Sequence, residues 1–180
     1  MVNFKPENNY ICFLLDKLIR KYEVKGPYLD IGCGKGDFSL FFAKKGFEGK
    51  AIDISKEAIE KTKEKLKDVE IQVERKDVKD EEGEYNTIIL FDILEHVPDS
   101  RALLQEAIKR LKREGTIIVS VPIGIKEWRW DDEVYGHYRR FEIEEITTLM
   151  EKEGCKILER WNYTFPIYWA LRRLYIAMFN

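Results

Sequence analysis

Three glycines at alternate positions, Gly32, Gly34 and Gly36, constrain the fold of this chain more than any other feature. A short apolar run ends just before them, and a helical pattern of apolar residues occupies 38–43 just after them. The order strand, glycine turn, helix places free backbone N–H groups and the positive end of a helix beside a space that only glycine leaves open. This stretch therefore predicts a binding site for a small polar ligand.

Strand-like and helix-like segments alternate along the rest of the chain, which is typical of an open, mostly parallel α/β sheet. Apolar runs predict strands at 28–31, 50–54, 69–74, 87–91, 116–121 and 156–162. Amphipathic patterns predict helices at 8–22, 56–67 and 142–153, and a further helix that Asp99 or Ser100 caps and Gly115 closes. In such sheets a ligand lies outside the carboxyl ends of the strands, near the switch in strand order.

Four acidic residues fall at or just past the predicted strand ends: Asp30, Asp53, Asp77 and Asp92. They would line one edge of the sheet and favour a ligand that carries positive charge and a ribose diol. A phosphate-binding P-loop is excluded because GxxxxGK is missing. A dinucleotide turn would need its third glycine where Asp37 stands, and a carboxylate there repels a pyrophosphate. The residues alone favour a cationic adenosine-type ligand.

Composition excludes several other classes of protein. A net charge of −2 argues against a nucleic-acid binder held by phosphate neutralisation. Three isolated cysteines and two histidines predict neither a disulfide framework nor a metal site, and we expect no metal. No apolar run is long enough to span a bilayer, and a reducing cytoplasm fits the cysteines best.

Three segments in register carry a resemblance to a known family. Residues 30–36, DIGCGKG, resemble the D-x-G-x-G-x-G signature of class I S-adenosylmethionine-dependent methyltransferases. Residues 91–97, FDILEHV, resemble the D-x-L-E-H segment of the ubiquinone- and menaquinone-methyltransferase-like, small-molecule branch, and 136–141, GHYRRF, resemble its H-x-R-x-F entry to a late helix. The resemblance covers roughly 28–160. It implies a Rossmann-like, doubly wound, mostly parallel sheet of six or seven strands with helices on both faces.

The resemblance also implies that S-adenosylmethionine is the cofactor and that the matched residues bind it. The backbone at Gly32, Gly34 and Gly36 would lie against the methionine part of the cofactor, with Asp30 supporting the turn. The main chain at Phe91 and Asp92 would face the methionine ammonium group and the acceptor. The remaining implied contacts are with the nucleoside: Asp53 to both ribose hydroxyls, Ile54 against the adenine, Asp77 to the adenine amino group, and Val78 through its backbone N–H.

The segment 123–141 has no clear periodicity and is rich in aromatic and charged residues, as expected of a substrate loop. His137 within it and His96 before it are candidate general bases for a hydroxyl acceptor, or else anchors of their loops. Candidate substrate contacts are Trp128, Trp130, Tyr138 and Arg139. The alternative for Arg139 and Arg140 is surface pairing with Glu142 and Glu144.

We expect one domain over 1–180, with the helix at 8–22 as a cap and an aromatic tail at 165–180. The tail reads as core or a dimer face, and an interfacial helix over 165–179 for a lipid-like acceptor is the less favoured alternative. The predicted protein is a monomer or homodimer that methylates a small molecule without binding nucleic acid. The other functions left open are a nicotinamide-dependent oxidoreductase and a non-catalytic cofactor-binding subunit.

Overall fold

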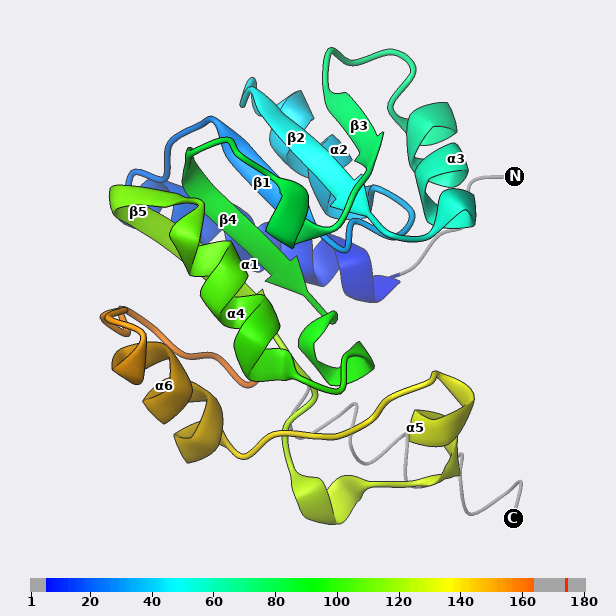
Figure 1. The fold of residues 1–180 in the computed structure, drawn as a ribbon, viewed down its shortest axis with the longest axis vertical. Coiled ribbons are helices and arrows are strands. Elements are labelled where there is room, and N and C mark those ends of the chain that lie inside the picture. Colours follow the sequence, from blue (N-terminus) through cyan, green and yellow to red (C-terminus); the bar gives the residue numbers. More distant parts are fainter. Residues whose placement is uncertain (1–5, 164–173, 175–180) are drawn as a thin grey trace.

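Five parallel strands form one sheet in the computed structural model, which describes residues 6–163 and Leu174 (Figure 1). The strand order is β3-β2-β1-β4-β5. The chain builds outward from β1 to β3 and then returns to the other side of β1, so the switch in strand order falls between β1 and β4. The strand bounds are β1 Tyr28–Ile31, β2 Gly49–Asp53, β3 Gln72–Arg75, β4 Tyr85–Phe91 and β5 Leu111–Ser120.

Successive side chains of β4 point to opposite faces of the sheet, and each face is packed against an apolar layer. Ile88 and Leu90 belong to the core cluster that also holds Leu104. Ile89 and Phe91 belong to the opposite cluster, and all four side chains are at most 9% exposed. The unbroken apolar run at 87–91 is therefore explained by cover on both faces.

Helices supply that cover. Helices α4 and α6 lie on one face of the sheet and α1 and α2 on the other (Figure 1). Helix α3 packs against β2 and β3 through Ile59, which joins Cys33 and Ala51. The predicted cap at Asp99 is confirmed, because its carboxylate accepts the N–H of Ala102 at the start of α4. Ser55 caps α3 in the same way by accepting the N–H of Ala58. The helix bounds are α1 Pro6–Lys21, α2 Asp37–Lys44, α3 Lys56–Lys65, α4 Ser100–Lys109, α5 Trp130–Val134 and α6 Ile143–Lys152.

The prediction of six or seven strands is wrong in number, since the described residues form five. Residues 155–163 have no regular secondary structure, so the strand predicted at 156–162 is wrong. Side chains hold this segment instead: the Tyr22 hydroxyl donates to the carbonyl of Leu158 and lies 2.9 Å from a Glu159 carboxylate oxygen. The predicted tail, apart from Leu174, lies outside the described residues.

Gly115 does not close a helix, contrary to the prediction. Helix α4 ends at Lys109, and Gly115 lies inside β5. The pairing partner on β5 moves from Leu111, opposite Tyr85, to Thr116, opposite Thr87. Glycine permits this change of register, because a Cβ at position 115 would lie 2.8 Å from the Leu111 side chain.

The segment 123–141 is more ordered than its sequence indicates. It contains a 3-10 turn, η3 (Ile125–Glu127), and helix α5, and a bridge between Ile123 and Phe141 closes its base. Within the described residues no helix combines the length and apolar character that crossing a membrane requires.

Candidate active site

The glycine turn lies directly after β1, at the switch in strand order. All three glycines have positive φ, at 71°, 55° and 73°, which is the left-handed conformation that glycine adopts without strain. A Cβ on Gly32 would lie 2.6 Å from Ile93, just after β4, and one on Gly36 would lie 2.8 Å from Thr62. A Cβ on Gly34 would meet nothing within 4 Å. The turn is therefore packed at both ends and open at its centre.

Asp30, the buried acid of β1 just before the turn, connects this strand to the helix that follows the turn. Its side chain is 2% exposed, and the Ser39 hydroxyl of α2 donates to its carboxylate at 2.5 Å. Burial raises the pKa of Asp30 to about 6, against the lowering effect of the Ser39 hydrogen bonds. The carboxylate thus links β1 to α2 and is too deeply buried to be the outer wall of a site.

Asp53 ends β2 beside the open centre of the turn. Its two carboxylate oxygens accept the N–H of Gly34 at 3.1 Å and the N–H of Ser55 at 2.8 Å. Each oxygen keeps a further lone pair for a ligand hydroxyl. Ile54 follows with 67% of its surface exposed, so its side chain is free to pack on a ligand bound over the turn.

Asp77 and Val78 lie at the third strand end, after β3. Asp77 caps the 3-10 turn η1 (Val78–Asp80) by accepting the N–H of Lys79 at 3.0 Å, and Lys79 also pairs with its other oxygen at 3.3 Å. The Val78 side chain is 4% exposed, so it anchors the turn in the core. Both residues therefore have a structural role in addition to the predicted contacts with adenine.

Asp92 brings the fourth strand end to the same edge. Its φ of 47° is uncommon for a residue other than glycine, and its carboxylate accepts from the Ser120 hydroxyl at 2.7 Å. The Phe91 ring before it stacks on Phe38 of α2 at 4.1 Å between centroids. The backbone at the end of β4 is therefore held by β5 through Ser120 and by α2 through Phe38.

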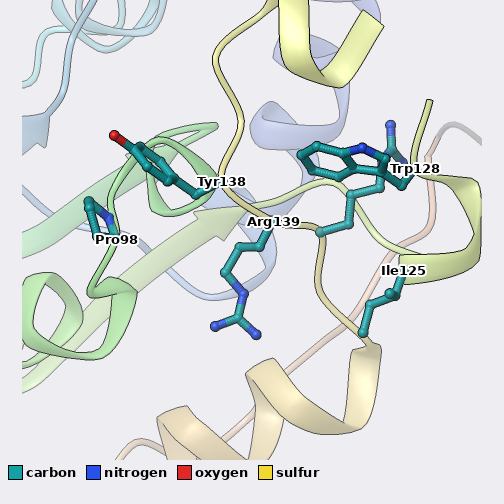
Figure 2. Close-up of a pocket in the computed structure, with 6 residues that line it drawn as sticks. Pro98, Ile125, Trp128, Tyr138 and Arg139 are labelled. Atoms are coloured by element: carbon teal, nitrogen blue, oxygen red, sulfur yellow. The ribbon is translucent and has the colours of Figure 1, made fainter. Parts of the chain in front are cut away.

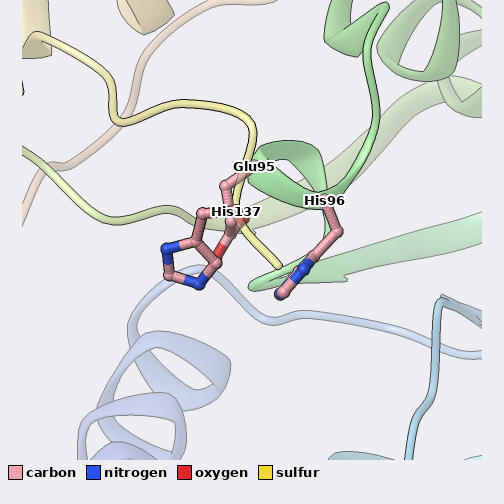
Figure 3. Close-up of side chains that lie close together, drawn as sticks. All are labelled: Glu95, His96 and His137. Atoms are coloured by element: carbon pink, nitrogen blue, oxygen red, sulfur yellow. The ribbon is translucent and has the colours of Figure 1, made fainter. Parts of the chain in front are cut away.

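Glu95, His96 and His137 come together beyond β4 (Figure 3). Glu95 and His96 belong to the 3-10 turn η2 (Leu94–His96), and one nitrogen or oxygen from each of the three side chains lies within 4.8 Å of the others. The two imidazole rings meet edge to face with centroids 4.8 Å apart. The two candidate bases predicted from distant segments are therefore neighbours.

Glu95 is an ionisable group held in an apolar position. Its side chain is 1% exposed, and its Oε2 atom has no hydrogen-bond partner among the described residues. Burial, followed by the nearby Asp92, raises the pKa of Glu95 to about 8, so the carboxyl is protonated at neutral pH. Burial and the neighbouring His137 lower the pKa of His96.

This pKa shift predicts a pH-dependent stability. Between the reference value of 4.5 and about 8 the folded state holds the Glu95 proton that the unfolded chain releases, so the free energy of unfolding falls as pH rises through this window. The expected loss is on the order of 1–3 kcal/mol. Urea unfolding at several pH values should show a shallower fall for Glu95→Gln than for the native chain. Equal slopes would contradict the shift, and the exposed Glu60→Gln is the control.

A cavity of about 530 Å³ opens beside this cluster (Figure 2). Of the predicted substrate residues, Trp128, Tyr138 and Arg139 line it, whereas Trp130 does not. Tyr138 is tied to the cluster because its N–H donates to the carbonyl of Glu95 at 2.7 Å. The remaining lining residues are Pro98, Ile125 and Arg140.

Both arginines are paired, but not with Glu142 or Glu144 as the alternative predicted. Arg139 pairs with Glu145, and Arg140 donates to Asp132 at 2.8 Å. Glu142 instead accepts the N–H of Ile125 at 3.0 Å. The Nε of Arg139 is buried without a partner among the described residues, which leaves a cationic donor beside the cavity.

A family model described as a methyltransferase domain matches residues 7–160, most of the chain. The chain belongs to this family. The match includes the glycine turn, the four strand ends, the histidine pair and the loop 123–141. The resemblance inferred from three short segments is thereby confirmed over the whole sheet.

Two curated relatives of this methyltransferase domain are ubiquinone biosynthesis O-methyltransferases. The protein of Pelagibacter ubique is 26% identical over 133 residues, covering 65% of this chain and 55% of the relative. That of Xanthomonas campestris is 31% identical over 98 residues, covering 51% of this chain and 41% of the relative. The chain therefore spans about half the length of the curated relatives it matches.

Solved structures show the same fold. Magnesium protoporphyrin IX methyltransferase from Synechocystis PCC 6803, crystallised with bound SAH, has a TM-score of 0.68 at 18% identity, over 88% of this chain and 80% of that one. A protein from Pyrococcus horikoshii OT3 has a TM-score of 0.56 at 26% identity, over 65% of this chain and 58% of that one. The sheet with its covering helices is thus that of a class I methyltransferase.

Asp132 is the residue that sequence reasoning missed at this site. It is 1% exposed and lies among His137, Arg140 and the backbone of Arg129. In the sequence it is one acid of a charged run, and nothing in that run distinguishes it from its exposed neighbours. The available signal was its spacing of five residues before His137, which becomes meaningful only once the chain between them turns.

Proposed function

We propose that this protein transfers a methyl group from S-adenosylmethionine to a hydroxyl of a small-molecule acceptor. The observation that carries the proposal is the open centre of the glycine turn, at the switch in strand order, with Asp53 on one side and Asp92 on the other. Carboxylates and backbone carbonyls at strand ends suit a ligand with an ammonium group, a sulfonium and a ribose diol. Family membership supports the same cofactor.

The proposed contacts follow the order of the strand ends. The backbone of the glycine turn holds the methionine part, Asp53 binds the ribose hydroxyls, and Ile54 lies on the adenine. Asp77 and the N–H of Val78 read the adenine edge, and the main chain at Phe91–Asp92 faces the methionine ammonium. The exposed surface of Ile54 and the spare lone pairs of Asp53 support these assignments.

The proposed acceptor binds in the cavity lined by Trp128, Tyr138 and Arg139. Aromatic walls and two arginines favour a flat, largely apolar molecule that carries an acidic or polar substituent. Oxygen is proposed as the methylated atom because the curated relatives are named O-methyltransferases. A lipid-like acceptor remains part of the proposal, and so do a single domain over 1–180, a monomer or homodimer, and a cytoplasmic location.

In the proposed reaction the acceptor oxygen attacks the methyl carbon in line with the carbon–sulfur bond. The acceptor O–H bond breaks as the O–CH3 bond forms, and the electron pair of the S–CH3 bond stays on sulfur as a neutral thioether. Positive charge is dispersed during this step, so the protein mainly aligns the groups, excludes water and accepts the hydroxyl proton. His137 and His96 are the proposed proton acceptors.

Isothermal titration calorimetry tests the proposal directly. We expect S-adenosylmethionine and its demethylated product to release heat at one site per chain, and NADH to release none. A screen of phenols, hydroxy acids and quinols with radiolabelled cofactor should then identify a methylated product. Binding of NADH alone would favour the nicotinamide oxidoreductase, and cofactor binding without transfer to any acceptor class would favour a non-catalytic subunit.

A further inference from the structure

Asp132 holds the loop 123–141 together from inside. The N–H of Arg129 donates to Oδ2 of Asp132 at 2.9 Å, and Nε of Arg140 donates to Oδ1 at 2.8 Å. Arg140 also donates to the carbonyl of Ile123 at the base of the loop. Although burial opposes ionisation, the hydrogen bonds from Arg140, Arg129 and His137 lower the pKa of Asp132 to about 2. The carboxylate is therefore a fixed negative charge.

The same carboxylate determines which nitrogen of His137 carries a proton. Nδ1 of His137 lies 2.9 Å from Oδ1 of Asp132. An ionised carboxylate only accepts hydrogen bonds, so Nδ1 is the protonated nitrogen. In the neutral ring Nε2 then carries the free lone pair. The His137 N–H also donates to the Asp132 carbonyl at 2.9 Å, which fixes the backbone of the histidine as well as its ring.

The ring of His137 lies within the side-chain cluster beyond β4. Its ring lies edge to face with His96, beside the buried Glu95, and 6.1 Å between centroids from Tyr135 (Figure 3). Nδ1 of His96 lies 3.3 Å from the carbonyl of Gly136, which accepts its hydrogen. The titratable side chains beside His137 are therefore Asp132, Glu95 and His96, with Arg140 bound to the same oxygen of Asp132 and the ring of Tyr135 nearby.

We propose that Asp132 is a positioning residue for His137, holding it in the tautomer and orientation in which Nε2 takes the proton of the acceptor hydroxyl. This inference rests on the proposed methyl transfer to oxygen. The proton moves from the acceptor oxygen to Nε2 as the O–CH3 bond forms, and the imidazolium that results lies against the negative charge of Asp132. The proton then leaves to solvent after the methylated product departs.

Asp132 could instead serve the loop alone, through Arg129 and Arg140. The two roles differ in what they require of the imidazole. If Asp132 only anchors the loop, it needs no particular tautomer of His137. Its substitution should then disturb the fold whether or not His137 is present. A positioning residue needs the Nδ1–H tautomer, and its effect on the turnover rate disappears once His137 is removed.

The tautomer can be measured without cofactor or acceptor. The chain contains two histidines, so a long-range 15N–1H spectrum of histidine-labelled protein shows two imidazole rings, which His96→Gln assigns. At mildly alkaline pH we expect His137 to show a protonated Nδ1 and an unprotonated Nε2. A protonated Nε2 would overturn the proposal.

A double-mutant cycle measures the coupling in catalysis, with the acceptor that the screen identifies. We expect Asp132→Asn to lower kcat by about 10- to 100-fold with KM changed less than about 3-fold, and to have no further effect in a His137→Gln background. Additive losses would assign Asp132 to the loop only and overturn the proposal. Asp131→Asn, the adjacent acid on α5, is the matched control and should leave kcat unchanged.

Calorimetry and the tautomer of His137 separate a failure of the proposed function from a failure of the proposed role of Asp132. If S-adenosylmethionine releases no heat, the proposed function fails, whatever the tautomer of His137. If the cofactor binds and is turned over but His137 carries its proton on Nε2, only the role of Asp132 fails. Circular dichroism of Asp132→Asn shows whether the fold is intact before any kinetic comparison is made.

Discussion

Asp53→Ala should weaken the binding of S-adenosylmethionine by about 100-fold. The proposed pair of hydrogen bonds from the ribose hydroxyls to a charged carboxylate corresponds to about 3 kcal/mol when both are lost. Calorimetry with the cofactor and with its demethylated product measures the change, and both ligands should lose affinity to the same degree because they share the ribose.

The design must separate a lost ligand contact from a disturbed turn. Asp53 also accepts the N–H groups of Gly34 and Ser55, so alanine removes two local hydrogen bonds along with the ribose contact. Asp53→Asn keeps the size of the side chain and one acceptor oxygen, and should give an intermediate loss. The exposed Glu57→Ala, on the helix that follows, is the control for charge alone. Unchanged affinity in Asp53→Ala would contradict the proposed ribose site.

Gly34→Ala should block the cofactor while leaving the fold largely intact. The added methyl group meets no atom of the protein within 4 Å and so projects into the space above the turn. That space is the proposed position of the methionine part, so affinity should fall by at least about 10-fold, which corresponds to 1.4 kcal/mol. The φ of 55° adds a conformational cost of about 1–2 kcal/mol, which lowers the free energy of unfolding.

Gly46 offers a matched control for this prediction. It closes α2 with a φ of 83°, and a Cβ there also meets nothing within 4 Å. Gly46→Ala should therefore show a similar loss of stability in urea unfolding but bind the cofactor normally in calorimetry. If both variants lose the cofactor, the effect is a general loosening of α2. If neither does, the open centre of the turn is not the cofactor site.

The glycine turn and the buried strands could be predicted because their causes are local. A left-handed backbone at Gly32, Gly34 and Gly36 requires glycine wherever it occurs, and the sequence carries that requirement directly. The apolar run of β4 likewise predicts a strand buried on both faces, since no polar residue interrupts it between Ile88 and Phe91. The strand-end acids follow once these strands are placed.

The features that were missed depend on contacts between distant segments. A strand was predicted at 156–162, but a strand needs a neighbour, and within the described residues β5 pairs only with β4. Gly115 has the residue type that ends a helix, but the extra length of β5 places it in a strand. The role of Asp132 required the loop to be folded, because its three partners come from both sides of α5.

The attachment of α1 has a consequence for the order in which the molecule folds. Lys21 and Tyr22, at and just after the end of α1, contact Glu159, which lies 138 and 137 positions later in the chain. During synthesis on the ribosome this attachment cannot form until all five strands of the sheet have emerged. The packing of Ile11 and Leu15 against Phe42 and Ile89 involves earlier residues alone, so the contacts with Glu159 can only add to it afterwards.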